Sequence, residues 1–91
     1  MAIGVYFSPA SMNAQKYGET LKALEAAGAA TPKGRSYHSA FGESNALHVF
    51  DVWDSQETFD AFGTVLMPIM AKLGVDPGQP QIMPVHNIIK G

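Results

Sequence analysis

The stretch Leu47-His-Val-Phe-Asp-Val-Trp-Asp-Ser-Gln-Glu-Thr-Phe59 decides the fold, because a strand pattern becomes a capped helix there within about two residues. Its first half is rich in β-branched and aromatic residues, which favour strands. Asp54 or Ser55 can then cap a helix, and Glu57 follows Asp54 at the spacing of a capping box. The junction therefore predicts a strand over residues 46–53 that is followed directly by a helix.

Three more strands and one more helix surround this junction. Strands are predicted over residues 3–8, 35–41 and 81–89. The first helix is expected to begin at Ser11 or Asn13 and to end at Gly28, and the second helix to end at Gly74. Residues 42–45 form a short hairpin signal between the second and third strands. The element order is β-α-β-β-α-β, a pattern that belongs to the α+β class.

Two prolines give further predictions about this order. Pro84 cannot donate to a sheet ladder, so the last strand should lie at a sheet edge or carry a bulge. Right-handed crossovers give the strand order 4-1-3-2, which also places the last strand at an edge. Pro68 falls inside the second helix and predicts a kink or a break, which either opens a pocket or only wraps the helix over the sheet.

Composition limits the partners of the chain. It has 91 residues, 46% of them apolar, with no cysteine and a net charge of −2, which suits one domain over residues 1–91. Without a Lys/Arg cluster we expect no nucleic-acid partner, and without a long apolar run we expect no membrane partner and a cytoplasmic location. A chain this short gains little from its own core, so oligomerisation is the expected further source of stability.

Alternation along the strands also indicates oligomerisation. In the third strand Val49, Asp51 and Trp53 share one face while His48, Phe50 and Val52 share the other. Both faces of the predicted sheet are largely apolar, yet two helices can cover only one of them. We therefore expect a second copy of the chain to cover the other face as a homodimer.

Together with the element order, the junction from Asp51 to Phe59 and the closing Pro84-Val-His-Asn87 resemble the dimeric α/β barrel superfamily, and more narrowly small bacterial proteins near the antibiotic-biosynthesis-monooxygenase-like group. The resemblance implies a ferredoxin-like protomer with two helices on one face of a four-stranded antiparallel sheet. It also implies a dimeric barrel with a small-molecule pocket in each protomer, but no single reaction. The haem-degrading branch is disfavoured, since residues 56–73 contain no histidine to bind iron and the first strand lacks that branch's asparagine.

His38 and Asp51 are the first candidate catalytic pair. With a four-residue hairpin loop, both lie on one face of the sheet and could interact diagonally. A carboxylate would hold the imidazole in one tautomer and prepare it to act as a general base. The alternative is a buried polar pair that has only a structural role. His38 and His86 would lie about 14 Å apart on the predicted strand order, so we expect no three-histidine metal site.

The remaining candidate residues are a second possible base and a set of pocket-lining side chains. His86 is the second candidate base, although a hydrogen bond to backbone would also explain it. Trp53 could stack on a substrate or serve only as core, and methionines are either adaptable pocket walls or ordinary gap fillers. The predicted substrate-binding residues are Trp53, Tyr37, Asn87, Met67 and Met70.

Three functions fit these residues. The leading one is a cofactor-independent monooxygenase of aromatic, quinol-like or polyketide-like substrates, in which His38 or His86 is the base and Asp51 orients it. A site of this kind needs no metal or flavin motif, so no cofactor is expected. The alternatives are a non-enzymatic, small-molecule-binding or stress-associated dimer, and an isomerase of lactone-like substrates.

Overall fold

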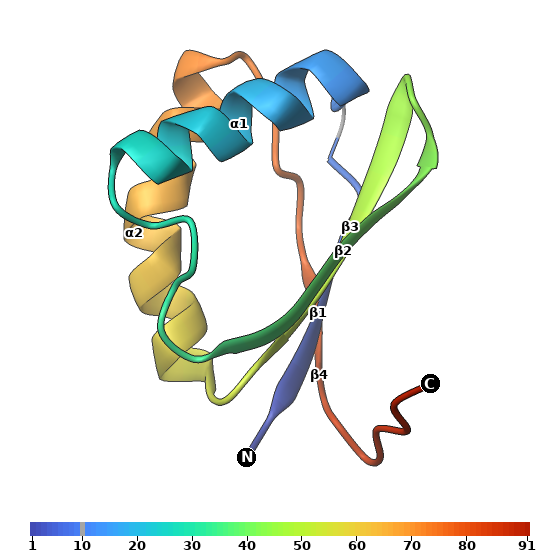
Figure 1. Ribbon diagram of the computed structural model, residues 1–91. Coiled ribbons are helices and arrows are strands. Elements are labelled where there is room, and N and C mark those ends of the chain that lie inside the picture. The colour runs from blue at the N-terminus through green and yellow to red at the C-terminus, as the bar shows by residue number, and fades with distance from the viewer. Residues whose placement is uncertain (10) are drawn as a thin grey trace.

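The computed structural model describes residues 1–9 and 11–91, and its elements follow the predicted order (Figure 1). The strands and helices are β1 (Ile3–Phe7), α1 (Ala14–Ala26), β2 (Arg35–Glu43), β3 (Ala46–Trp53), α2 (Gln56–Lys72) and β4 (Gln81–Pro84). The four strands form one sheet in the order β2-β3-β1-β4, with antiparallel pairing throughout. This is the predicted strand order and a ferredoxin-like α+β fold.

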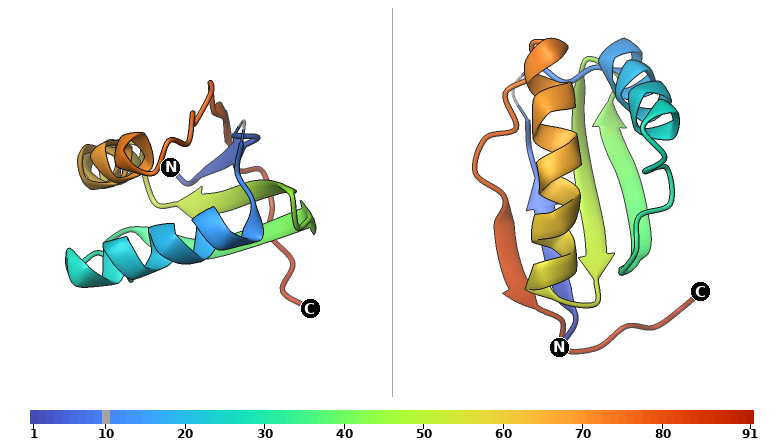
Figure 2. Two further views of the ribbon diagram at one scale, coloured as in Figure 1. Left: turned by 90° about the horizontal axis from the view of Figure 1, so that it is seen from above. Right: turned by 90° about the vertical axis from the view of Figure 1, so that its left-hand side faces the viewer.

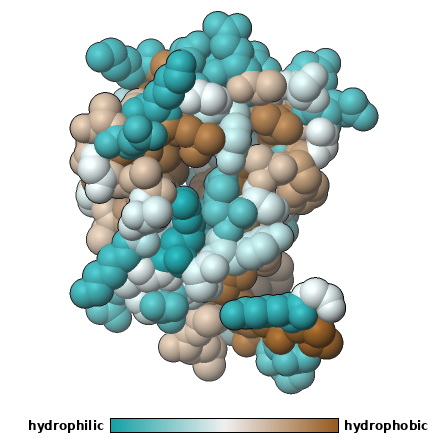
Figure 3. Space-filling view, viewed as in Figure 1, coloured by the Kyte–Doolittle hydropathy of each residue, from teal (hydrophilic) through white to brown (hydrophobic). Residues whose placement is uncertain are grey.

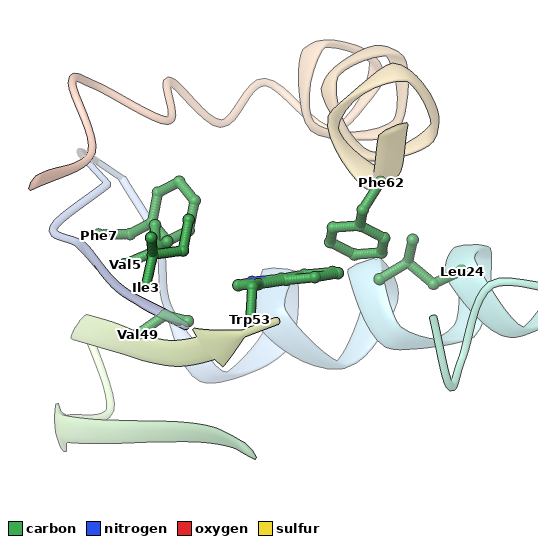
Figure 4. Packing of buried hydrophobic residues seen from close by; sticks show 7 residues of the cluster. All are labelled: Ile3, Val5, Phe7, Leu24, Val49, Trp53 and Phe62. Carbon is green, nitrogen blue, oxygen red and sulfur yellow. The ribbon is translucent and has the colours of Figure 1, made fainter. Parts of the chain in front are cut away.

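Both helices lie on the same face of the sheet (Figure 2). That face carries the core, which is built around Trp53 at the end of β3 (Figure 4). The Trp53 ring is fully buried, and its centroid lies 5.1 Å from that of Phe62 and 5.7 Å from that of Phe59. The buried residues of this cluster are Ile3, Val5, Phe7, Leu24, Val49, Trp53 and Phe62. Trp53, at the strand-to-helix junction, therefore packs against both the sheet and the helices.

The hairpin between β2 and β3 is tighter than predicted. The strands extend to Glu43 and from Ala46, so only Ser44 and Asn45 form the turn. Gly42, at a φ of 104°, adopts a conformation that side-chain-bearing residues avoid, and it pairs with Leu47. The prediction of a four-residue loop was wrong by two residues of register, which keeps His38 and Asp51 on their predicted face. His38 consequently lies directly opposite Asp51 and not diagonal to it.

A β-bulge interrupts the start of β2. Arg35 pairs with Trp53 while Tyr37 pairs with Val52, so Ser36 is the extra residue. Regular alternation would put Arg35 and Tyr37 on the same face. The bulge instead places Arg35 on the helix-covered face with His38, and leaves Tyr37 on the opposite face.

The helix caps settle alternatives that the sequence left open. The Asn13 side chain accepts from the Lys16 N–H at 2.8 Å, so Asn13 is the N-cap of α1. Ser55, not Asp54, caps α2 by accepting from the Thr58 N–H. Asp54 instead donates its backbone N–H to the Gly34 carbonyl at 2.7 Å. The predicted capping box with Glu57 is therefore not the arrangement used.

Pro68 does not break α2, which continues to Lys72. The proline removes one backbone donor, but Met70 is buried on the next turn and the Leu73 N–H donates to the Ile69 carbonyl. Burial of Met70 offsets the missing hydrogen bond, so of the kink or break that was expected the break is absent.

The last strand is shorter than predicted. It ends at Pro84, as an edge strand beside β1, and residues 85–91 continue as an extended tail below the sheet (Figure 1). The Val85 N–H still donates to the Ala2 carbonyl, after which the chain leaves the sheet. His86 and Asn87 thus lie on the tail and not on a strand. No helix in the described part of the chain is both long and apolar enough to cross a bilayer.

Candidate functional site

A small cavity lies between the two helices and the helix-covered face of the sheet. Its volume is about 50 Å³, it is partly open to solvent, and its walls are mostly apolar. The polar side chains in its wall are Tyr17 and Thr20 from α1, Arg35 and His38 from β2, and Asp51 from β3. Thr20 bonds the Lys16 carbonyl of its own helix, which leaves four polar groups for chemistry.

Four side chains form one hydrogen-bonded series at this cavity. The Tyr17 hydroxyl lies 2.7 Å from His38 Nε2, and His38 Nδ1 lies 2.5 Å from Asp51 Oδ1. The indole Nε1 of Trp53 donates to the other carboxylate oxygen, Asp51 Oδ2, at 3.3 Å. The series runs from α1 through two adjacent strands into the core.

Hydrogen-bond chemistry gives the series a direction. A carboxylate only accepts and an indole N–H only donates, so with Asp51 ionised His38 Nδ1 must carry a proton. Neutral His38 then has its lone pair on Nε2, and the Tyr17 hydroxyl donates to it. This is the tautomer that a carboxylate imposes on a histidine general base.

Burial separates the members of the series. The Asp51 side chain is almost completely buried, whereas that of His38 is 22% exposed. Burial raises the pKa of Tyr17; nearby Arg35 opposes this effect and the charge of Asp51 adds to it. Tyr17 is therefore a neutral phenol near neutral pH, which leaves His38 as the proton acceptor of the site.

The structure distributes the predicted site residues over three places. His38, Asp51 and Met70 line the cavity, and Trp53 lies behind it as core, where it orients Asp51. The stacking role expected for Trp53 is not available in this position. Three further residues lie elsewhere: Tyr37, His86 and Asn87 surround a groove on the opposite face of the sheet. Met67 is exposed on the outer side of α2.

Tyr17 and Arg35 line the cavity but were missed from the sequence. Tyr17 fits the apolar stripe of α1, so its hydroxyl gave no signal of a polar contact. Arg35 is brought to the cavity by the bulge at Ser36, which alternation cannot reveal. The only available signal for Tyr17 was its place on the helix face that packs over His38.

A second histidine–tyrosine pair lies on the opposite face of the sheet. The Tyr6 hydroxyl is 2.6 Å from His48 Nδ1, and the His48 ring stacks with the rings of Tyr6 and Phe41. Among the described residues, no carboxylate forms an ion pair with His48. This pair therefore lacks the group that fixes the tautomer of His38.

Residues 1–9 and 11–91 also contain no cluster of three metal-ligating side chains.

Comparisons with solved structures agree with this fold. A protein from Chloroflexus aurantiacus assigned as an antibiotic biosynthesis monooxygenase is similar over 100% of both chains, with a TM-score of 0.65 and 18% identity. SnoaB, a cofactor-independent oxygenase from Streptomyces nogalater, matches 99% of this chain and 96% of its own, with a TM-score of 0.62 and 16% identity.

A third protein, from Caulobacter crescentus and assigned in the same way as the first, has a TM-score of 0.59 and 20% identity over 97% of this chain and 91% of its own. Neither the scan against protein-family models nor the search of curated proteins found a match. At these identities the likeness shows the fold alone. The chain has the ferredoxin-like fold shared by antibiotic-biosynthesis-monooxygenase-like proteins, as the sequence resemblance predicted.

Proposed function

We propose that this protein is a cofactor-independent monooxygenase-like enzyme in which His38 is the general base. The observation that carries the proposal is the directed series from Tyr17 through His38 to Asp51 at the wall of an apolar cavity. Asp51 holds the base in one tautomer, and Trp53 holds Asp51. The structural likeness to SnoaB adds support at the level of fold.

The chemistry requires an acidic substrate and O₂. A proton from a substrate hydroxyl passes to the Tyr17 oxygen while the Tyr17 proton moves to His38 Nε2, which produces an imidazolium and a delocalised substrate anion. The anion passes one electron to O₂, and the substrate radical and superoxide combine into a peroxide anion. This anion takes the proton back from the His38 imidazolium through Tyr17 and becomes a hydroperoxide. Loss of water from an activated CH₂ centre then leaves a carbonyl, so that the substrate and O₂ give the ketone and H₂O.

Cavity size limits the substrate. A dry cavity of about 150 Å³ is large enough to hold benzene, whereas this one encloses about 50 Å³. The enclosed part therefore holds only a portion of a ring, and the remainder of the ring must lie at the open rim near Leu21, which is 42% exposed. A single-ring quinol-like substrate fits this shape better than a fused polyketide.

A second copy of the chain is proposed to cover the opposite face of the sheet. Tyr37 is 54% exposed and Met83 60% exposed on that face, and the hydrophobic residues Ile88 and Ile89 are exposed on the tail beside it. Hydrophobic atoms of the tail are visible at the lower right of the space-filling view (Figure 3). In an isologous dimer, this same surface on each of the two copies would be buried against the other copy.

One observation favours a non-enzymatic alternative, a dimer that only binds a small apolar molecule. Both ring nitrogens of His38 already have partners, so the series is complete as a structural network. In that case the cavity would bind a ligand without turnover. A lactone isomerase would use the same base but consume no O₂.

Oxygen uptake with a panel of hydroxylated single-ring aromatics tests the proposal. We expect His38→Ala to lower kcat/KM by roughly 10²- to 10⁴-fold, the usual contribution of a general base. His48→Ala is the matched control, because it removes a tyrosine-bonded histidine from the other face and should leave uptake nearly unchanged. Binding without uptake by the wild-type protein would contradict the oxygenase and support the binding dimer.

A further inference from the structure

The surface that the cavity exposes is almost wholly apolar, although polar side chains contribute to its wall. The polar atoms of these side chains bond to other parts of the protein. Tyr17, His38 and Asp51 bond one another in series. Thr20 and Arg35 each donate to a backbone carbonyl. The cavity therefore meets a ligand mainly with apolar atoms.

A cavity of this kind holds water poorly. A buried water needs roughly two to four polar partners, and within residues 1–9 and 11–91 every buried side-chain nitrogen or oxygen already has a partner. Enclosed apolar cavities stay dry and bind apolar guests such as xenon. The volume of about 50 Å³ is too small for a whole aromatic ring but leaves room for a diatomic molecule.

We propose that the buried end of this cavity is a binding site for molecular oxygen. This end is formed by Leu24, Phe62 and Met70, which are 5%, 7% and 4% exposed. O₂ is small, uncharged and apolar, so it gains free energy when it leaves water for such surroundings. The inference rests on the proposed function and assigns a place to the second substrate, which that proposal leaves open.

The two ends of the cavity separate the two substrates of the proposed reaction. Leu21 marks the open rim, where the part of a ring that the cavity does not enclose must lie. His38 belongs to the wall of the same cavity, and its side chain is 22% exposed. O₂ at the buried end therefore lies next to a ring at the rim, and holding the two reactants together lowers the entropic part of the barrier.

NMR of the methyl groups under O₂ pressure tests the inference without any substrate. Dissolved O₂ is paramagnetic and broadens the signals of nearby methyl groups whether or not it reacts, and nitrogen gas at the same pressure gives the baseline. We expect the methyl signals of Leu24 and Met70 to broaden several-fold more than those of Ile3. Ile3 is the matched reference, because it is buried in the same core but lies outside the cavity wall.

Leu24→Phe should fill the buried end and remove the extra broadening at Met70. Leu66→Phe is a second filling variant at a partly buried position of the wall, where the larger ring has more room to adjust. Leu73→Phe is the control, since it makes the same change outside the wall and should broaden like the wild type.

Equal broadening at Leu24, Met70 and Ile3 in the wild-type protein would overturn the inference. So would undiminished broadening at Met70 in folded Leu24→Phe and Leu66→Phe variants. Selective broadening in a protein that consumes no oxygen with any hydroxylated aromatic would support the O₂ site and contradict the oxygenase. Oxygen uptake without selective broadening would support the oxygenase and overturn the site.

Discussion

The two faces of the sheet carry the same chemical pair in different surroundings. On the helix-covered face, Tyr17 bonds His38, and Asp51 lies behind the imidazole. On the opposite face, Tyr6 bonds His48, whose ring packs between aromatic side chains without a carboxylate. A tyrosine–histidine contact is therefore common to both faces, and the buried carboxylate is what distinguishes a candidate base from a packed side chain.

The faces also differ in what covers them. The helix-covered face encloses a cavity with Arg35 and Tyr17 in its wall. The opposite face exposes aromatic and aliphatic side chains around a broad groove bordered by the C-terminal tail. We propose a small ligand for the first face and a second copy of the chain for the other, so changes to each should affect different measurements.

The largest expected effect comes from Gly34, which brings the bulged start of β2 against α2. Its φ is 90°, and an added Cβ would lie 2.5 Å from Thr58 Cβ. We expect Gly34→Ala to lower the free energy of unfolding by roughly 2 to 5 kcal/mol, through backbone strain and overpacking together. Urea denaturation measures the change.

Gly28→Ala is the control for Gly34→Ala. Gly28 has a φ of 73°, but nothing lies within 4 Å of the added carbon. It should cost only the conformational strain, about 1 to 2 kcal/mol. Equal losses for the two variants would show that β2 does not approach α2 as closely as the structure indicates.

The second prediction removes the difference between the two histidines. Asp51→Asn keeps the shape of the side chain but replaces one of its two acceptor oxygens with an NH₂ group. Since His38 and Trp53 each donate to a different oxygen of Asp51, one of the two N–H groups must lose its partner. We expect a loss of about 1 to 3 kcal/mol in stability. Oxygen uptake should fall as well, because the tautomer of His38 is no longer imposed.

Asp54→Asn provides the comparison, since Asp54 is exposed and neighbours the same junction. Its effect on unfolding should be within about 0.5 kcal/mol. If Asp51→Asn is as mild as this control, the buried series contributes nothing to stability.

The third prediction concerns the open face. Tyr37→Glu places a charge where a second copy is proposed to pack, so the dimer dissociation constant should rise by about tenfold or more. Met67→Glu makes the same kind of change on the outside of α2, where Met67 is 42% exposed, and should not alter it. Light scattering over a concentration series distinguishes the two. A wild-type protein that is monomeric at all concentrations would refute the shared face.

The smallest effect is expected from Tyr17→Phe, at high pH. Because burial raises the pKa of Tyr17, the folded protein holds this proton more tightly than the unfolded chain does. Stability from the neutral phenol is complete below about pH 10, the ordinary tyrosine value, and is lost as the pH rises through the folded-state pKa. The wild type should thus exceed Tyr17→Phe by about 1 kcal/mol at neutral pH, and this advantage should shrink above about pH 10. A constant difference from pH 8 to 11 would contradict the burial of the hydroxyl.

Much of the fold could be predicted because local signals agree with tertiary packing. The junction after Trp53, the glycines that end both helices, and Pro84 at a sheet edge all act through nearby backbone. The face shared by His38 and Asp51 followed from alternation, which survives a two-residue register error. The sequence therefore sufficed for the order of elements and for the central pair.

The remaining parts of the site depend on features that no local pattern reveals. The bulge at Ser36 moves Arg35 to the cavity and leaves Tyr37 outside it. Tyr17 reaches His38 only because α1 crosses over β2, and the end of β4 at Pro84 carries His86 and Asn87 away. Each outcome follows from tertiary packing or backbone irregularity, not from residue type.

Nitrogen-15 NMR of the histidine side chains tests the central claim most directly, because long-range couplings identify which ring nitrogen carries the proton. In its neutral form, His38 is predicted to carry its proton on Nδ1, donated to Asp51, with an unprotonated Nε2 that accepts from Tyr17. In Asp51→Asn this preference should be lost. A neutral His38 ring that carries its proton on Nε2 in the wild-type protein would contradict the proposed base and the direction of the whole series.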